Sequence, residues 1–336
     1  MVTIKDIARK AGVSHSTVSR ALAGNPRISE ATRVRIVRIA QSLGYERNEL
    51  ARGLVKGALK AIGLVIPDIT NPFLADIARG VSDIADRKGY GVVLCNTDRK
   101  EDKELGSIQL LRSMRVPGLI LASIGTDPPY LEKLKNSGAP YILVSRICPS
   151  LEAPYVVIDD KEGARIATEH LVSLGHKHIA FIGGSPDLKT TQDRLTGYRE
   201  ILKKYDLPEN PRWICLNGST QAAGREAAQQ ILTRSPRPTA IVAENDITAI
   251  GVMETADNIG LHIPDDLSLV GFDDISYSSL PRIQLTTVAQ PAVEMGQMAA
   301  EWLIAAVENR PHPELRRVLP PRLVVRASTS NPPDVP

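Results

Sequence analysis

The sequence has few cysteines, few aromatic residues and no long apolar run. Its three cysteines, Cys95, Cys148 and Cys215, are far apart and show neither CxxC nor metal-ligand spacing. They therefore indicate reduced thiols, and exclude a disulfide framework or a cysteine-bound zinc site. The longest apolar runs, such as residues 61–67, have the length of a strand. A membrane span needs roughly 18 apolar residues, so none is expected.

The chain also lacks the patterns of secretion and of common enzyme sites. Polar residues, Lys5 and Asp6, interrupt the N-terminus at once, so there is no signal core and we expect a cytoplasmic protein. No GxxxxGK[ST], no GxGxxG after a strand and no GxSxG is present. The sequence therefore predicts a protein that is not an enzyme and needs neither a cofactor nor a metal.

Length and charge point to a basic head on an acidic body. A chain of 336 residues with 43% hydrophobic residues is expected to form two or three globular domains. Residues 1–60 hold 12 Lys and Arg against 4 Asp and Glu, a net charge of +8, while the remainder carries −5. Such a head favours binding to a polyanion; a merely solvated basic surface is the alternative.

The first 45 residues contain three short helical patterns. Thr3 and Asp6 form a capping box for the first. Gly12 permits a tight turn before the second, which Ser14 caps. Each pattern has an apolar face that we expect to be buried, namely Ile4, Ile7 and Ala8, then Val18, Ala21 and Leu22, then Val34, Val37, Ala40 and Leu43.

This arrangement predicts a helix-turn-helix, whose second helix enters the DNA major groove. The outward residues at its N-terminal end are His15, Ser16, Ser19 and Arg20. Arg20 is suited to two hydrogen bonds with a guanine edge. Residues suited to phosphate contacts are Ser14, Thr17, Arg9, Lys10, Arg33 and Arg35. A small three-helix bundle with ordinary surface arginines is the alternative.

After residue 60, short Val- and Ile-rich runs alternate with helical patterns. The runs do not alternate with polar residues, which is typical of strands buried on both faces. The helical patterns include 73–88, 161–174, 195–205, 222–232 and 247–259, and a late one at 292–307. Strand-helix alternation predicts parallel sheets. About 270 residues of it are too many for one sheet, so we expect two α/β lobes.

Polar residues follow the predicted strands, where open parallel sheets bind ligands. They are Asp68, Asn96, Ser123, Ser145, Arg146, Asp159, Asp160, Asn217, Asn245, Asp246, Asp273, Asp274 and Gln290. A cleft lined by them suits a polyhydroxylated ligand. Alternatively, most of these acids and amides, Asp160 and Asp246 included, cap the following helices.

Three further side chains have two interpretations each. Phe73 and Phe272 flank strand ends, where an aromatic ring either stacks on a sugar or packs in the core. Arg194 lies early in a helix, where it either holds ligand hydroxyls or a carboxylate, or forms a surface ion pair.

The stretches "TIKDIARKAGVSHSTVSRAL", "ISEATRVRIVRIAQSLGY" and "NELARGLVKG" resemble the headpiece of the lactose-repressor (LacI/GalR) family of bacterial transcription regulators. The body, with "IPDITNPFLADIARG", "RPTAIVAEND" and "GLHIPDDLSLVGFDDI", resembles the same family. The resemblance implies an α/β fold with a periplasmic-binding-protein-like, two-lobed body. The implied divisions are a headpiece at 1–46, a hinge at 47–60, an N-lobe at 61–158 and 291–318, and a C-lobe at 159–290 and 319–330.

The resemblance also implies roles for single residues. The implied effector contacts are Phe73, Arg194, Asn245 and Asp273, with Asn71, Asn96, Ser145, Ser219 and Gln290 as further candidates. Leu54 stands where a hinge leucine wedges into the minor groove. The predicted DNA contacts are then Thr3, Ser14, His15, Ser16, Thr17, Ser19, Arg20, Asn25, Tyr45, Arg52 and Leu54.

The sequence departs from the family pattern at several positions. Ser219 replaces a frequent aromatic residue, and Ser145 precedes Arg146 where Asp-Arg is common, which favours an acidic or smaller effector. Arg47 and Glu49 stand where Pro and Ala are frequent. The C-terminal residues carry no leucine heptads, so a dimer is expected.

These observations together predict a repressor that binds a near-palindromic double-stranded DNA operator as a homodimer. A sugar, or an acid or phosphate derived from one, is expected to bind between the lobes and to control operator affinity. A solute-binding protein or an α/β enzyme that uses the same cleft is the alternative function.

Overall fold

The computed structural model describes residues 2–22, 24–45, 59–122, 134, 136, 138–148, 153–313 and 316–333. It divides into two compact units, residues 1–59 and 60–336. Residues 47–58 of the predicted hinge, with Arg52 and Leu54, lie outside the described residues, as does Ser123. No helix among the described residues is both long enough and apolar enough to cross a membrane.

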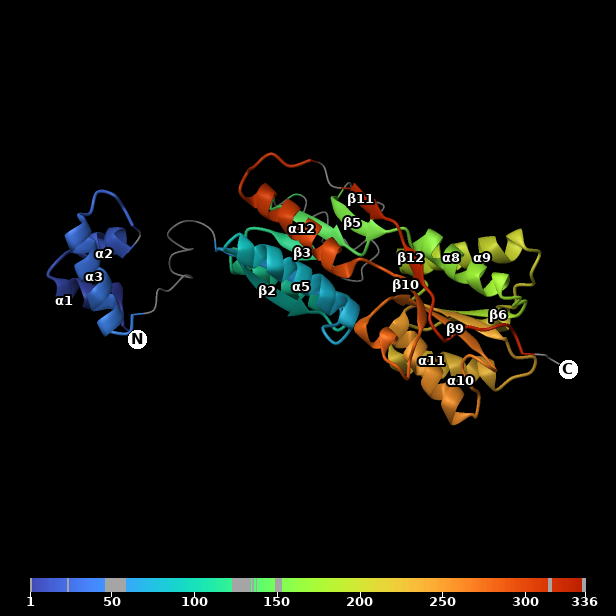
Figure 1. The fold of residues 1–336 in the computed structure, drawn as a ribbon. Helices are drawn as coiled ribbons and strands as arrows, with labels where there is room; N and C mark the ends of the chain where they lie inside the picture. Colours follow the sequence, from blue (N-terminus) through green and yellow to red (C-terminus); the bar gives the residue numbers. More distant parts are fainter. Residues whose placement is uncertain are drawn as a thin grey trace. The chain divides into compact units, whose positions relative to one another are not determined.

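The described residues of the first unit form a bundle of three helices, α1 (Ile4–Ala11), α2 (His15–Leu22) and α3 (Glu30–Ser42) (Figure 1). The backbone N–H and the hydroxyl of Thr3 both donate to the Asp6 carboxylate, at 3.0 and 2.7 Å. These bonds lower the pKa of Asp6 below its ordinary value. Gly12 has a φ of 64°, as the turn between α1 and α2 requires. The predicted capping box of α1 and the predicted turn at Gly12 are therefore both confirmed.

The buried face of α3 differs from the prediction. Ile36 and Ala40 are buried, whereas Val34 and Val37 are 41% and 36% exposed. Apolar residues occur on two faces of this helix, so helical spacing alone fits more than one stripe. Packing against Ile7 and Val18 selects the face that contains Ile36.

The second unit contains two six-stranded sheets. The first sheet forms the core of the N-lobe, and all of its strand pairs are parallel. Its order is β11 (Arg316–Leu319), β5 (Tyr155–Ile158), β4 (Tyr141–Val144), β3 (Leu119–Leu121), β1 (Ala61–Ile66) and β2 (Gly91–Asn96). The helices of this lobe, in the part of the chain that the structure describes, are α5 (Pro72–Arg87), α6 (Glu101–Ser113) and α12 (Ala292–Val307).

The second sheet forms the core of the C-lobe. Its order is β12 (Arg322–Val324), β10 (Thr286–Ala289), β9 (Ser268–Asp273), β8 (Ala240–Ala243), β6 (Ile179–Gly183) and β7 (Ile214–Leu216). Helices α8 (Asp160–Ser173) and α9 (Lys189–Lys204) cover one face, and α10 (Gln221–Leu232) and α11 (Asp246–Asn258) cover the other (Figure 1). Two 3-10 turns, η1 (Pro211–Trp213) and η2 (Ser276–Ser279), complete it. Parallel sheets are thus confirmed, except that β12 pairs with β10 in the antiparallel direction.

Helices α5 and α12 touch through their backbones. A Cβ atom on Gly80 would lie 2.0 Å from the carbonyl oxygen of Val293, and one on Gly296 would lie 2.2 Å from that of Ile77. Neither position has room for a side chain. This close approach explains how a helix from the end of the chain becomes part of the N-lobe core.

The chain passes between the lobes three times. The passages join β5 to α8, β10 to α12, and β11 to β12. Leu319 belongs to β11 and pairs with Ile158, so the last passage follows Leu319, one residue beyond the predicted boundary. Strand β11 is a short edge strand, and three of its four residues are exposed.

A buried histidine fastens the C-terminal segment to the second sheet. The Nε2 atom of His176 lies 3.0 Å from the carbonyl oxygen of Ser330, and Nδ1 lies 2.9 Å from the Thr239 hydroxyl. The carbonyl only accepts, so Nε2 carries the proton and Nδ1 accepts from Thr239. Burial lowers the pKa of His176 below its ordinary value, which favours the neutral ring.

We expect the contribution of His176 to stability to vanish in acid. Its pKa is lower folded than unfolded, so the contribution is present above about pH 6.5 and is lost as the pH falls. His176→Leu should therefore lower the Tm clearly at about pH 8 and less at about pH 5. Thermal unfolding followed by circular dichroism measures this. His262→Leu, an exposed position in the same lobe, is the control. A Tm difference that does not change with pH would contradict the prediction.

Candidate functional site

A cavity of ≈ 130 Å³ lies among the strand ends of the two lobes. That is space for on the order of ten waters, comparable to the number of non-hydrogen atoms in a monosaccharide. The lining includes eight of the nine predicted effector residues, namely Asn71, Phe73, Ser145, Arg194, Ser219, Asn245, Asp273 and Gln290. The strand ends therefore meet as expected for an open α/β sheet.

Arg194 is the centre of the C-lobe side of the cavity. Its Nε and Nη2 atoms lie 2.8 and 2.7 Å from one carboxylate oxygen of Asp160. Its Nη1 donates to the carbonyl oxygen of Glu244, and the guanidinium lies 3.6 Å from the centroid of the Phe272 ring. The residue is 7% exposed. Arg194 is thus a buried, fully engaged cation, and the surface ion pair considered above is wrong.

The carboxylates around Arg194 outnumber its single positive charge. Burial lowers the pKa of Arg194, but Asp160 and Glu244 outweigh this and hold it above its ordinary value. Burial raises the pKa of Asp160 to about 6, against the opposing effect of Arg194. Burial also raises the pKa of Asp273 well above its ordinary value. One guanidinium therefore faces more carboxylates than it neutralises.

Asn245 and Gln290 are held by neighbouring groups. Asn245 caps α11, since its carbonyl oxygen accepts from the Thr248 N–H at 2.8 Å, and its amide donates to the Ser219 carbonyl at 3.4 Å. The Gln290 amide donates to Asp273 at 2.6 Å. Asp273 has a φ of 112°, an unusual conformation for a residue with a side chain. These bonds fix the positions of the polar groups on the cavity wall.

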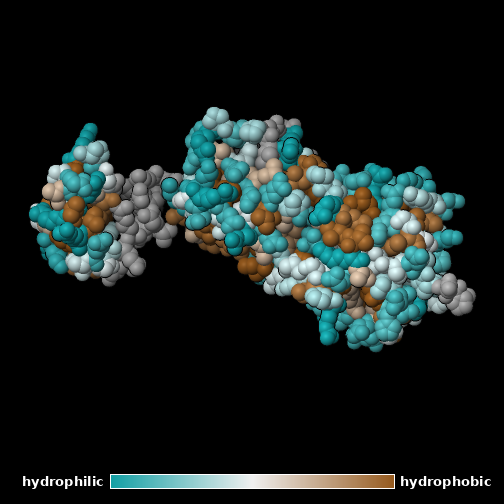
Figure 2. Space-filling view, in the orientation of Figure 1, coloured by the Kyte–Doolittle hydropathy of each residue, from teal (hydrophilic) through white to brown (hydrophobic). Residues whose placement is uncertain are grey.

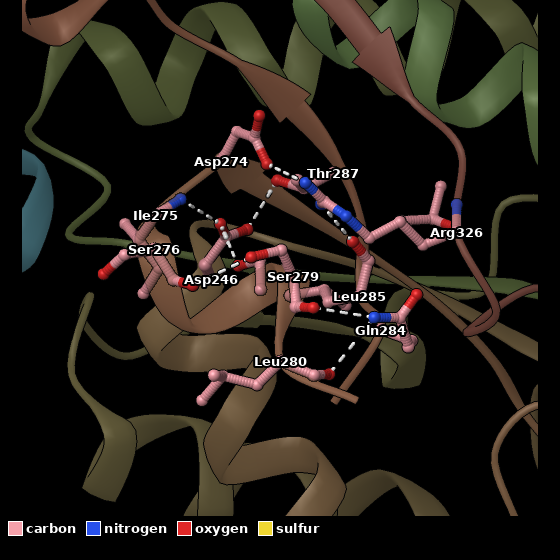
Figure 3. A network of polar contacts seen from close by, with 12 residues as sticks. Asp246, Asp274, Ile275, Ser276, Ser279, Leu280, Gln284, Leu285, Thr287 and Arg326 are labelled. Atoms are coloured by element: carbon pink, nitrogen blue, oxygen red, sulfur yellow. Dashed lines mark hydrogen bonds and ion pairs between the residues drawn. The ribbon is translucent and has the colours of Figure 1, made fainter. Parts of the chain in front are cut away.

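Asp246 does not cap a helix. Its carboxylate is completely buried and accepts from the Ile275 N–H, the Ser278 hydroxyl and the Thr287 hydroxyl, at 2.9, 2.6 and 2.5 Å (Figure 3). Burial raises its pKa to about 6. The carboxylate thus joins the start of α11 to η2 and β10, which brings Asn245 and Asp273 together.

The capping expectation for Asp160 and Asp246 is therefore wrong in both cases. The residue before each one is the cap, because Asp159 accepts from the Glu162 N–H and Asn245 accepts from the Thr248 N–H. In a pair of polar residues at a helix start, the first is the cap and the second begins the helix. The second side chain then points elsewhere, here into buried networks.

The N-lobe contributes the start of α5. Asn71 caps this helix through a 3.0 Å bond from the Phe73 N–H, and the Phe73 side chain lines the cavity with 5% exposure. Asn96 is not part of the lining. Its side chain accepts from the Ile69 N–H at 2.8 Å and donates to Asp98 at 2.5 Å, so it fixes the loop after β1. Phe272 packs in the core and is 1% exposed, which excludes stacking on a ligand.

Sequence reasoning missed three charged side chains of the lining and gave Arg146 no role. The missed ones are Arg99, Lys189 and also the acidic Glu244. Arg99 lies 3.3 Å from Asp68, Arg146 lies 3.4 Å from Glu104, and Lys189 pairs with Asp193. In the stretch "AEND", residues 243–246, only Asn245 and Asp246 were singled out from the sequence. Glu244 directly follows β8, so the expectation that polar residues after a strand line the ligand site applied to it as well.

The headpiece presents a second candidate site. His15, Ser16, Ser19 and Arg20 are exposed on α2, while Val18 and Ala21 are buried. The Ser14 hydroxyl accepts from the Thr17 N–H at 3.1 Å and lies 2.8 Å from the Ser16 hydroxyl. Arg35 donates to the Ala11 carbonyl at 3.0 Å, which joins α3 to α1. The polar face at the start of α2 is therefore ordered on a rigid bundle.

The remaining predicted contacts of the headpiece are distributed around it. Thr3 and Asn25 lie at the start of α1 and after α2, and Tyr45 packs on the bundle core. Arg9 lies 3.7 Å from Asp6 and Arg33 pairs with Glu30. Among the residues that the structure describes, no His, Cys, Asp and Glu side chains are grouped so that they would hold a metal ion.

Comparison with known proteins finds similarity over both units. Residues 3–48 match "Bacterial regulatory proteins, lacI family", and residues 168–329 match "Periplasmic binding protein-like domain". Catabolite control protein A of Priestia megaterium is 36% identical over 329 residues, 98% of this chain and 99% of the relative. The HTH-type transcriptional regulator GalR of Escherichia coli is 35% identical over 332 residues, 99% and 97% of the two chains.

A solved structure, titled the lac repressor dimer bound to operator and the anti-inducer ONPF, is similar over nearly the whole chain. It has a TM-score of 0.83 and 27% identity, and the match covers 98% of this chain and 99% of that one. Headpiece and body thus occur together in the relatives, in the same order along the chain.

Proposed function

The chain belongs to the lacI family of bacterial regulatory proteins, and from that premise we propose how it acts as a regulator. It is a DNA-binding transcription regulator and not an enzyme. We propose that it is a repressor which binds a near-palindromic operator in the cytoplasm. The observation that carries this proposal is the ordered polar face of α2, on a basic headpiece joined to a body with a polar cavity.

Arg20 is the proposed reader of a guanine in each half-site. It is exposed in the last turn of α2, next to Ser16 and Ser19 on the same face. Thr3, Ser14, His15, Thr17, Asn25 and Tyr45 are proposed to hold the headpiece in register or to read neighbouring bases.

Arg20→Ala should weaken operator binding by roughly 1–3 kcal/mol and relax the preference at one base pair per half-site. Titration of labelled operators in which each base pair is changed in turn measures both effects. Arg225→Ala, an exposed position of the body, is the control and should change neither. Equal discrimination by wild type and Arg20→Ala at every base pair would contradict the assignment.

The hinge, with Arg52 and Leu54, is proposed to follow the minor groove between the two headpieces. Its charge is basic, and Leu54 is the apolar residue suited to wedge between base pairs. Leu54→Ala should therefore reduce DNA bending and specific affinity while nonspecific binding is unchanged. Fluorescence transfer across an end-labelled operator measures the bend, and an identical bend in both proteins would exclude the wedge.

We propose a homodimer with one effector in each body. Large apolar side chains are exposed on the body, among them Ile69, Tyr277 and Leu280, and Figure 2 shows hydrophobic patches on its surface. Exposed apolar patches commonly mark protein interfaces. Sedimentation equilibrium gives the test: a species of 36.5 kDa at all concentrations, the mass of one chain, would contradict the dimer.

The cavity is proposed to bind a sugar or a sugar derivative whose binding changes operator affinity. A structure with 29% identity and a TM-score of 0.74 is titled "transcriptional regulator CelR-cellobiose complex", which supports a carbohydrate. Polar groups of both lobes line the cavity, so a ligand there favours one arrangement of the lobes over others. A thermal-shift screen identifies the compound, since a ligand at 100 times its Kd adds about 2.7 kcal/mol to stability.

A further inference from the structure

Glu244 has a carboxylate oxygen without a hydrogen-bond donor. The residue follows β8, lines the cavity and is 4% exposed. Its Oε1 atom accepts from the Thr191 hydroxyl at 3.2 Å and lies 3.8 Å from Nη1 of Arg194. The Oε2 atom is buried and accepts from no described group.

A buried carboxylate oxygen in this state is unfavourable, because it has lost water without gaining a partner. The Glu244 side chain is packed against the backbone of Gly184 and the side chain of Thr191. A Cβ atom on Gly184 would lie 2.8 Å from Oε1 of Glu244 and 2.7 Å from the Thr191 hydroxyl, so the group is closely packed from that side. A hydroxyl group of a molecule bound in the cavity can supply the missing donor. A carboxylate or phosphate of that molecule supplies none and repels the charge.

The cations of the lining do not offset this preference. Arg99, Arg146, Lys189 and Arg194 are each paired with a carboxylate, and an anionic ligand has to compete with those partners. Asp273, which lines the same wall, accepts from Gln290. The cations that line the cavity are therefore not free to neutralise an anionic ligand.

We propose that Glu244 determines the class of effector: it accepts a hydrogen bond from a hydroxyl group of an uncharged, polyhydroxylated molecule and excludes the corresponding acids and phosphates. This inference rests on the proposed function of the cavity as the effector site. The sequence favoured an acidic or smaller effector, on the basis of Ser145 and Ser219 alone; the proposal opposes the acidic part of that expectation.

The test uses the full-length protein and matched neutral and anionic probes in titration calorimetry. The probes are D-glucose, D-galactose, D-ribose and cellobiose, with D-glucuronate, D-galacturonate, glucose 6-phosphate and ribose 5-phosphate as their anionic counterparts. The variants are Glu244→Gln and, as a matched control, Glu226→Gln at an exposed position of α10. Tm values show that the variants are folded.

For the wild type we expect at least one neutral probe to bind at least about tenfold more tightly than its anionic counterpart. Glu244→Gln should weaken the neutral probe by about tenfold, because a charged acceptor makes the stronger hydrogen bond. It should also strengthen the anionic counterpart, so that the ratio of their Kd values approaches one. Glu226→Gln should leave both Kd values unchanged.

Two results would overturn the proposal without touching the proposed function. One is an anionic probe that binds the wild type as tightly as, or more tightly than, its neutral counterpart. The other is a Glu244→Gln variant with the wild-type ratio. If every neutral probe fails to bind at roughly 10 mM, the ligand class is wrong and the assignment of Glu244 falls with it. Loss of operator binding by the wild type would instead refute the function on which the inference rests.

Discussion

Arg194→Ala should lower the free energy of unfolding of the body by roughly 3–5 kcal/mol, because it leaves buried carboxylates without their cation. Asp160 loses both of its bonds from the guanidinium, Glu244 loses the donor to its carbonyl, and Phe272 loses the group that covers its ring. This effect goes beyond ligand binding. A residue that was expected to contact the effector also holds the C-lobe side of the cavity together.

Differential scanning calorimetry measures this effect, and a loss of about 10 °C in Tm is expected. Arg199→Ala is the matched control. It lies on the same helix, is half exposed and pairs with Glu209 on the surface, so its removal should cost less than about 1 kcal/mol. Equal Tm losses for the two variants would show that burial of Arg194 contributes nothing. Operator binding below the lowered Tm should persist, since the headpiece has its own core.

Asp246→Ala should be comparably destabilising. The substitution leaves the Ile275 N–H and the hydroxyls of Ser278 and Thr287 buried without their acceptor. Each buried unsatisfied group costs about 1–3 kcal/mol, so a total loss of roughly 3 kcal/mol or more is expected. Urea unfolding followed by tryptophan fluorescence measures it. A loss under about 1 kcal/mol would contradict the network.

Asp246→Asn is the control that separates charge from shape. The amide keeps an acceptor for the Ile275 N–H, so it should cost far less than alanine. Burial raises the pKa of Asp246 to about 6, above its unfolded value of 3.8. The part of its contribution to stability that depends on protonation is thus complete below about pH 4 and is lost as the pH rises to about 6. The asparagine variant should lack this decline, and an unchanged pH profile would contradict the assignment.

The sequence sufficed for the elements whose pattern is local. The capping box of Thr3 and Asp6, the turn at Gly12 and the helix at 292–307 depend on neighbouring residues, and the structure has each of them. The strand ends could be placed for the same reason, because a buried strand ends where its apolar run gives way to polar residues. Grouping of the polar residues in one cavity then followed from the parallel direction of the strands.

Other features depend on contacts between distant segments, and there the sequence failed. Ile36 was not separable from Val34 and Val37 until the partner helices were placed. The role of Asp246 requires Ile275 and Thr287, far along the chain, and the role of Phe272 requires Arg194 above its ring. Antiparallel pairing of β12 likewise depends on the third passage between the lobes.

The three passages between the lobes have a mechanical consequence. The three connecting segments act as a hinge between the lobes that bends about a common axis. Sliding or twisting one lobe against the other would stretch at least one of these segments. We therefore expect the lobes to move relative to one another mainly along one coordinate, the bending of these segments. Gln290 lies on the middle passage and is bonded to Asp273 in the cavity wall, so an occupant of the cavity acts directly on that coordinate. Regulation by a bound molecule then requires only that the molecule favours one angle between the two lobes. It does not require a chain of contacts through the lobes.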